Sequence, residues 1–199
     1  MGCVKDILLV CEDDAHNAFV YQCMKTMGVK NLKWHIDKYT ASRVRAHHGN
    51  RAEVIDRLKD TEYCAWRQRN AKCKVLLVAV IDADEDEINC AKQSLGASDW
   101  MADYSHLFVH IIPKRNIQTW VKLAESCSSD VPNESEDYKT TGIRSAAKSR
   151  DAAKKLTKIF MDKIANNGVN IPFEANPVWM TFFTQMEELR KALKVKPWI

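Results

Sequence analysis

The sequence predicts an α/β fold: a mainly parallel sheet of four strands with helices on both faces, followed by a helical C-terminal region. Two observations support this. Short apolar runs such as Asp6 to Cys11 and Lys74 to Ile81 alternate with longer segments of helical periodicity, which is typical of strands covered on both faces. The chain of 199 residues is also long enough to bury one full core.

The first half of the chain predicts two strands and two helices. Asp6 to Cys11 is the first strand, and the apolar positions of His16 to Met27 recur at helical spacing. Gly28 stands where a helix end favours a residue of left-handed conformation, and Leu32 to Tyr39 alternates as a second strand does. Ala52 to Arg69 carries an apolar stripe and predicts the second helix.

The central part repeats this alternation. Lys74 to Ile81 is a β-branched run and predicts the central strand, followed by a polar helix from about Glu85 to Leu95. Leu107 to Ile112 predicts a fourth strand, which Pro113 terminates, and a helix from about Asn116 to Ala124 follows it. Strands that alternate with helices in this way favour a parallel sheet.

The predicted α/β core spans residues 1–125, and residues 126–199 form a loop and helical extension packed on it. Cys127 to Lys139 is rich in Ser, Asp and Glu and predicts a surface loop, with helices over Ile143 to Asn166 and Val178 to Leu193. The last helix carries an apolar stripe formed by Trp179, Phe182, Phe183, Met186 and Leu189. This stripe predicts a packing face, or a partner-protein interface if it stays exposed.

Composition favours a cytoplasmic protein. The longest unbroken apolar run, Val75 to Ile81, is too short to cross a bilayer, so no membrane span is expected. The seven cysteines contain no C-x-x-C pair and no zinc-type spacing with histidine. They are expected to be small buried hydrophobic residues in a reducing compartment.

Acidic residues follow the first and the central strand at their carboxyl ends. Glu12 comes directly after the first strand, and Asp82 and Asp84 follow the central one. Ligands of open parallel sheets bind beyond the carboxyl ends of the strands, and residues two apart on extended chain project to the same side. Gathered carboxylates repel unless a cation neutralises them, and their oxygens suit Mg²⁺ or Mn²⁺. An isolated D-x-D is often a solvated loop, but its pairing with Glu12 favours a metal site, with Asp86 as a weaker fourth ligand or a residue of the next helical turn.

Basic side chains gather in stretches that a polyanionic partner, DNA or RNA, would bind. One stretch holds Arg43, Arg45, His47, His48 and Arg51, and the other holds Lys139, Arg144, Lys148, Arg150, Lys154, Lys155 and Lys158. Of these we assign nucleic-acid contact to Arg43, Arg45, His48 and Arg51, together with Arg115. Two solvated basic faces are an equally good interpretation.

Three further residues have two interpretations each. Lys114 and Arg115 would contact phosphate, with Lys114 at the scissile group, or they are solvated cations before a helix that Asn116 caps. His16 lies one turn after Glu12 and is a general acid or base, or a surface residue, as lone helical histidines commonly are.

The order of these acids resembles a known family. An apolar strand that ends in Glu12, followed by one that ends in the D-x-D of Asp82 and Asp84, is similar to the Toprim domain of topoisomerases, bacterial primases and overcoming-lysogenization-defect nucleases. The resemblance covers roughly Val4 to Leu123 and implies a Rossmann-like Toprim fold. It also implies that these three acids hold Mg²⁺ for cutting or joining phosphodiester bonds.

Two positions depart from the family pattern. Asp13 stands where many Toprim sequences have Gly directly after the glutamate. The segment Ile112 to Trp120, IPKRNIQTW, resembles a stretch of small Toprim-like bacterial proteins that reads N-I-E-T-W, and Gln118 stands in place of that Glu. If that position normally supports a metal, one anionic group is missing here.

Two functions follow as hypotheses. The first is a Mg²⁺-dependent or Mn²⁺-dependent nuclease, similar to nuclease effectors of bacterial anti-phage defence, in which Glu12, Asp82, Asp84 and Lys114 are catalytic. The second is a non-catalytic Toprim-like subunit that binds nucleic acid or a partner protein, which Gln118 and the aromatic stripe of the last helix favour. A phosphoryl-handling enzyme for small substrates is a third, although nucleotide-binding signatures such as G-x-x-x-x-G-K-[ST] and G-x-G-x-x-G are absent from the sequence.

Overall fold

The computed structural model describes residues 6–29, 33–36, 51–58, 75–84, 88–96, 108–126, 132–136, 138, 145–166, 170–171 and 173–194. In chain order the elements are β1 (Asp6–Cys11), α1 (Asp14–Thr26), β2 (Lys33–Ile36), α3 (Arg51–Leu58), β3 (Val75–Val80), α5 (Ile88–Gly96), β4 (Phe108–Ile111), α7 (Ile117–Glu125), α8 (Ala146–Ala165) and α9 (Pro177–Leu193). Each overlaps a segment for which the sequence predicts an element of the same type.

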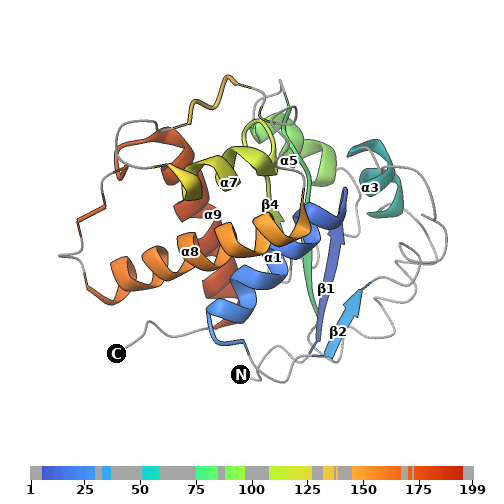
Figure 1. Ribbon diagram of the computed structural model, residues 1–199. Coiled ribbons are helices and arrows are strands. Elements are labelled where there is room, and N and C mark those ends of the chain that lie inside the picture. Colours follow the sequence, from blue (N-terminus) through green and yellow to red (C-terminus); the bar gives the residue numbers. More distant parts are fainter. Residues whose placement is uncertain are drawn as a thin grey trace.

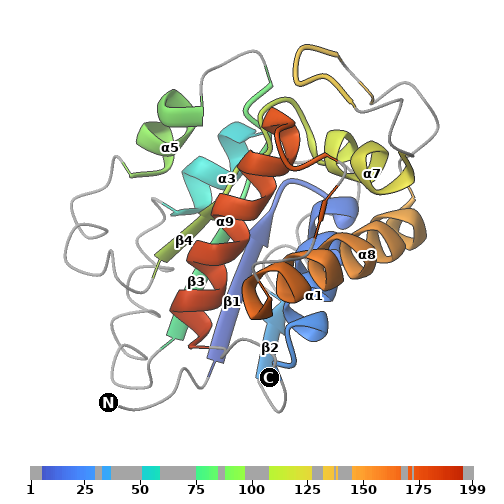
Figure 2. The ribbon, with the colours of Figure 1, turned by 90° about the vertical axis from the view of Figure 1, so that its left-hand side faces the viewer.

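The strands form one parallel sheet, which Figure 1 shows nearly edge-on, and Figure 2 shows their order β2-β1-β3-β4. β1 and β3 lie side by side along their whole length, from the pair Asp6 and Val75 to the pair Cys11 and Val80. β2 lies beyond β1 and β4 beyond β3, so strand order reverses between β1 and β3. The prediction of a mixed α/β fold with a parallel sheet is confirmed, and the arrangement is consistent with a Rossmann-like fold.

Helices cover both faces of the sheet (Figure 2). On one face, α1, α7, α8 and α9 enclose a core in which the rings of Trp120 and Phe182 meet edge to face at 5.3 Å. On the other face, Val54 of α3 and Ala91 and Leu95 of α5 pack on the sheet. Burial on both faces explains why β3 is an unbroken apolar run without alternation.

The apolar stripe of α9 belongs to the first of these cores. Its residues Trp179, Phe182, Met186 and Leu189 are at most 2% exposed, and Phe183 packs against Phe160 with ring centroids 5.2 Å apart. The prediction of a packing face is therefore confirmed, and the stripe is not exposed to a partner. α8 packs on α1 and α7, and α9 packs on α7 and β4. These contacts do not mark a boundary at residue 125, so the division of the chain there stays a prediction.

The ends of the helices follow the sequence. The Asp13 carboxylate accepts hydrogen bonds from the backbone N–H groups of Ala15 and His16, which caps α1 at its start. Gly28 directly follows Met27, the C-cap of α1, and has a φ of +85°, where glycine is favoured. Asn116 accepts from the N–H of Thr119, so the interpretation of Asn116 as the cap of α7 is confirmed.

No helix in the described part of the chain combines the length and the apolar character that crossing a membrane requires.

A side-chain amide of α9 completes the edge of the sheet. Gln185 Oε1 accepts from the Ile112 N–H at 2.6 Å, and Gln185 Nε2 donates to the Ile112 C=O at 2.7 Å. Both residues are buried, so this pair of hydrogen bonds replaces the water that would otherwise reach the edge.

We expect Gln185→Leu to lower the free energy of unfolding by about 2–3 kcal/mol, because two buried backbone groups lose their partners. Urea denaturation measures this change. Thr184→Ala, at the exposed neighbouring position on α9, is the matched control and should stay within about 0.5 kcal/mol of the parent. Equal stability of both variants would contradict the role of the Gln185 amide.

Candidate metal centre

Glu12 lies where β1 ends beside β3. The N–H of Asp82 faces β1, and at this point the backbone of β1 has already turned into the loop that leads to α1. The Glu12 carboxylate takes the place of the missing ladder partner, since its Oε1 accepts from the Asp82 N–H at 2.9 Å. The residues that follow β1 and β3 are thus joined directly, as the switch in strand order predicts.

Asp82 is almost completely buried, with 1% of its surface exposed. Its Oδ1 accepts from the backbone N–H of Ile117 at 2.9 Å and lies 2.8 Å from Nε2 of His16. Ile117 is the first residue of α7, so the carboxylate sits at the positive end of that helix dipole. These contacts stabilise a charged Asp82 inside the protein and hold it in one orientation.

His16 is buried between two carboxylates. Nε2 faces Asp82 Oδ1, and Nδ1 lies 2.6 Å from Asp13 Oδ1. Carboxylate oxygens only accept hydrogen bonds, so both ring nitrogens must donate and the ring is an imidazolium. Burial by itself lowers the pKa of His16, but the nearby Asp82 and Asp13 carboxylates together raise that pKa well above its ordinary value. The interpretation of His16 as a surface residue is therefore wrong, since only 1% of the residue is exposed.

The partners of His16 also determine the charge of Asp13. Burial raises the pKa of Asp13, but the hydrogen bonds from the His16 ring and the backbone N–H groups of His16 and Ala15 outweigh burial and hold that pKa well below its ordinary range. Asp13 is therefore a carboxylate at neutral pH, and its negative charge faces the imidazolium of His16.

Glu12 adds a further negative charge beside this group. Burial and the neighbouring Asp82 carboxylate raise the pKa of Glu12 to about 7. Burial is the larger cause, and the charge of the nearby Asp82 carboxylate adds to it, whereas the His16 cation offsets only part of the shift. A divalent cation would relieve this repulsion and favour the charged form of Glu12.

The donor atoms fit a hard divalent cation. One ligand atom each from Glu12, His16 and Asp82 lies within 4.8 Å of the others. The carboxylate oxygens of Glu12 and Asp82 are of the type that Mg²⁺ and Mn²⁺ bind. His16 has no nitrogen lone pair to offer as long as both nitrogens donate to carboxylates, so we assign it the role of internal cation.

Asp84 lies outside this cluster. β3 ends at Val80, and Asp84 has a φ of 54°, so the extended-chain argument that places Asp84 on the same side as Asp82 is wrong. Asp84 is exposed whereas Asp82 is buried, although its charge still contributes to the raised pKa of Glu12. Asp86, the predicted fourth ligand, lies outside the described residues.

The loop between β4 and α7 lies against the loop that carries these acids. The backbone N–H of Asp84 donates to the C=O of Arg115, and that of Ala83 donates to the C=O of Pro113. Lys114 and Arg115 are half-buried at the same edge of the sheet as Asp82. This places both predicted phosphate-binding residues next to the candidate centre.

The remaining predicted residues are not brought to the centre by the described contacts. Arg43, Arg45, His47 and His48 lie outside the described residues, and Arg51 is the half-buried first residue of α3. Gln118 is buried in the first turn of α7, and its Oε1 has no hydrogen-bond partner in the part of the chain that the structure describes. It does not belong to the cluster of Glu12, His16 and Asp82.

Of the second basic stretch, the part that the structure describes lies on α8. Lys148, Arg150, Lys154, Lys155 and Lys158 are exposed there. Lys155 donates to the backbone C=O of Ala124 at the end of α7, so this lysine is a partner of a helix terminus. The exposure of the group fits both a solvated face and a surface for a polyanion.

Asp13 departs from the Toprim pattern, which commonly has Gly at this position, yet it has a defined role in the structure. Asp13 caps α1 and at the same time bonds the ring of His16, three residues on. A helix-capping aspartate followed at that spacing by histidine is a local signal that would have predicted this pair. The contact of His16 with Asp82 spans 66 residues and has no local signal.

Binding of Mg²⁺ or Mn²⁺ is expected to weaken about tenfold for each pH unit below 7. Glu12 must lose its proton to serve as a ligand, and with a pKa of about 7 it is increasingly protonated as the pH falls. Calorimetric titration with Mn²⁺ at pH 6 and pH 8 measures this effect. Affinity that is equal at both pH values would show that Glu12 does not take part.

Three side chains thus define the candidate metal centre: Glu12 and Asp82 as ligands and His16 as the internal cation. They meet at the switch point of a parallel sheet, where ligands of such folds bind. Comparison of the chain with protein-family models, with curated proteins and with solved structures finds no match in any of the three.

Proposed function

We propose that the protein is a metal-dependent nuclease that hydrolyses phosphodiester bonds of DNA or RNA. The observation that carries this proposal is the meeting of Glu12 and Asp82 at the switch point, where the pKa of Glu12 is raised to about 7. Carboxylates that lie close together away from solvent lower the stability of the fold, and such groups are typical of functional sites. Binding of Mg²⁺ or Mn²⁺ beside the phosphate of a nucleic acid is a function that fits them.

The bound cation would supply a nucleophilic water at neutral pH and would neutralise charge on the phosphate. The chain itself contributes a fixed geometry. Asp82 is held by His16 and by the N–H of Ile117, so it needs no reorientation to act as a ligand. Glu12 gives up its proton when the cation binds.

The basic residues nearest to this centre would hold the substrate. Lys114 and Arg115 lie on the loop that bonds the Asp84 backbone, at the same edge of the sheet. We assign Lys114 to the scissile phosphate and Arg115 to a neighbouring one. The exposed cations of α8 would extend this contact along the nucleic acid.

The Toprim assignment and a role in bacterial anti-phage defence belong to the same proposal. The positions of Glu12 and Asp82 at adjacent strand ends support the assignment. The exposed position of Asp84 supports it less, because this residue would have to turn inward to join the other two. A cytoplasmic location is consistent with this role, and the defence role rests on resemblance alone.

A second candidate is a non-catalytic Toprim-like subunit that binds nucleic acid or a partner protein. The observation that favours it is Gln118, a buried amide at the position where the resemblance leads one to expect a glutamate. An amide cannot supply the negative charge of a carboxylate. Such a subunit would bind a nucleic acid or a partner without cleaving anything.

The two candidates differ in one assay. Supercoiled plasmid, linear DNA and RNA are incubated with the protein and Mg²⁺ or Mn²⁺, and the products are separated by electrophoresis. The nuclease proposal expects cleavage that chelation of the metal stops. Binding of a nucleic acid in a gel-shift assay without cleavage of any substrate would favour the non-catalytic subunit.

A further inference from the structure

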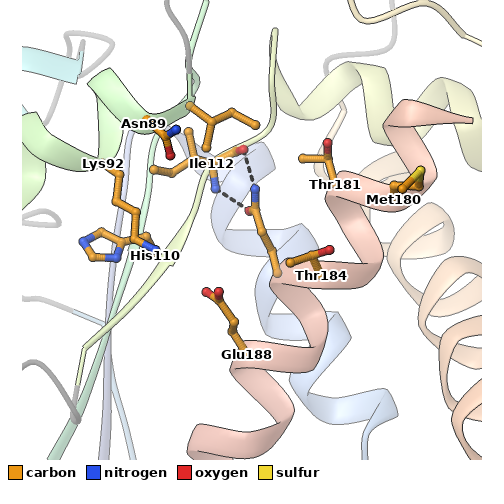
Figure 3. Close-up of a pocket in the computed structure, with 10 residues that line it drawn as sticks. Asn89, Lys92, His110, Ile112, Met180, Thr181, Thr184 and Glu188 are labelled. Atoms are coloured by element: carbon orange, nitrogen blue, oxygen red, sulfur yellow. Dashed lines mark hydrogen bonds between the residues drawn. The ribbon is translucent and has the colours of Figure 1, made fainter.

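A cavity lies along β4, the last strand in the sheet order, between α5, β4 and α9. Its volume is about 290 Å³, and its lining comes from both faces of the sheet (Figure 3). None of Glu12, His16 and Asp82 is among its lining residues, so this cavity is distinct from the candidate metal centre. Among its lining residues, Lys92, His110, Ile112, Gln185 and Glu188 bear on what would bind there.

The cavity borders backbone groups of an edge strand. The C=O groups of Ile111 and Pro113 accept from Ile81 and Ala83, so these two residues of the edge segment face β3. Neighbouring residues of a strand direct their N–H and C=O groups to opposite sides. The backbone groups of His110 and Ile112 therefore point away from β3, toward the space between α5 and α9.

The pairing of Ile112 with Gln185 shows what fits this edge. The amide of Gln185 donates to the C=O of Ile112 and accepts from its N–H, as a peptide group of an added strand would (Figure 3). Among the described residues, the side-chain amide bonds to this edge segment are those of Gln185 to Ile112, and none reaches the backbone of His110, two residues earlier. Within the described part of the chain, the edge of β4 is thus closed at Ile112 and open to a peptide group at His110.

The two walls of the cavity carry opposite charges. Lys92 of α5 lies on one face of the sheet and Glu188 of α9 on the other, and both are exposed (Figure 3). Neither forms an ion pair with another described residue. Burial, aided by the nearby Lys92 charge, lowers the pKa of His110 to about 4, so the His110 ring adds no charge at neutral pH.

We propose that this cavity binds an extended peptide of a partner protein, which adds to β4 as a further strand. Successive side chains of a strand point to opposite faces of the sheet. An acidic residue of the peptide would face Lys92, and a directly adjacent basic residue would face Glu188. The partner is therefore a segment with neighbouring acidic and basic residues, and the proposal is independent of the metal chemistry.

The test uses two capped hexapeptides of equal composition with a fluorescent label. Acetyl-Thr-Val-Glu-Lys-Val-Thr-amide has adjacent charges, whereas acetyl-Thr-Glu-Val-Lys-Val-Thr-amide places both charges on one face. Fluorescence anisotropy with the full chain is expected to give an affinity about fivefold higher for the adjacent order. N-methylation of the amide of one charged residue should abolish binding and that of the other should not, because only every second residue bonds to β4.

Charge reversal at Lys92 tests whether the charged walls of the cavity select the peptide. Lys92→Glu is expected to weaken the binding of the adjacent peptide about fivefold, whereas Lys154→Glu, an exposed lysine of α8, should leave it unchanged. Both positions are exposed, so both variants should fold, which circular dichroism verifies. Equal affinity for the two peptides or tolerance of N-methylation at both residues would each overturn the proposal.

Discussion

Replacement of Asp82 by asparagine is expected to reduce metal-dependent cleavage about a thousandfold and to remove measurable binding of Mn²⁺. The asparagine side chain keeps an oxygen that accepts from the Ile117 N–H and from Nε2 of His16. It loses the negative charge that a cation needs as a partner. Cleavage rates and calorimetric titration with Mn²⁺ measure the two effects.

Asp151→Asn is the matched control for this variant. Asp151 is exposed on α8, so the substitution removes the same charge without touching the centre. It should retain the activity of the parent. An active Asp82→Asn protein would contradict the assignment of Asp82 as a metal ligand, and loss of activity in both variants would point to a general effect of charge.

Replacement of His16 by leucine is expected to lower the free energy of unfolding by about 3–5 kcal/mol, because it removes the cation from a buried group of carboxylates. Asp82, with 1% exposure, would lose its charge-neutralising partner, and Asp13 would lose a hydrogen bond of 2.6 Å. Urea denaturation at neutral pH measures the loss.

The double variant His16→Leu/Asp82→Asn separates this effect from simple loss of packing. Removing the carboxylate charge as well should recover about half of the lost stability, which a double-mutant cycle detects as coupling. Additive losses would show that His16 acts through its volume alone. A loss below about 1 kcal/mol in the single variant would contradict the buried ion pair.

The pH range of this effect follows from the two shifted groups. The pKa of His16 is raised, so its contribution is fully present below its ordinary value of 6.5 and is lost only as the pH rises through its higher folded-state pKa. The pKa of Asp13 is lowered, so its contribution is present above its ordinary value of 3.8 and is lost as the pH falls below it. Neutral pH therefore lies inside the range where both stabilise the fold.

The sequence predicts the elements and the two main ligands for a local reason. Apolar periodicity depends on which side of an element is buried, and it is readable in a window of a few residues. Glu12 and Asp82 were predicted because each follows such a run directly, and parallel strands bring their carboxyl ends together. Asp84 differs from the prediction because β3 ends at Val80 and the backbone at Asp84 is left-handed, so the chain does not stay extended to this residue.

The internal cation and the closed sheet edge depend on contacts between distant parts of the chain. His16 meets Asp82 across 66 residues, and Gln185 meets Ile112 across 73. Both polar side chains lie on the buried face of their helix, although histidine and glutamine in a helix are commonly surface residues. Their partners, the Asp82 carboxylate and the Ile112 backbone, can be identified only from the folded chain, because they are distant in sequence.

In our proposal, Glu12 and Asp82 hold one divalent cation at the switch point of the sheet. The most direct measurement is anomalous diffraction from a crystal soaked with Mn²⁺, beside an identically treated crystal of the Asp82→Asn variant. We expect a peak in contact with carboxylate oxygens of both residues, absent in the variant, with His16 still bonded to Asp13. A peak at neither residue, or one in which the nitrogen of His16 replaces an oxygen of Asp82, would contradict it.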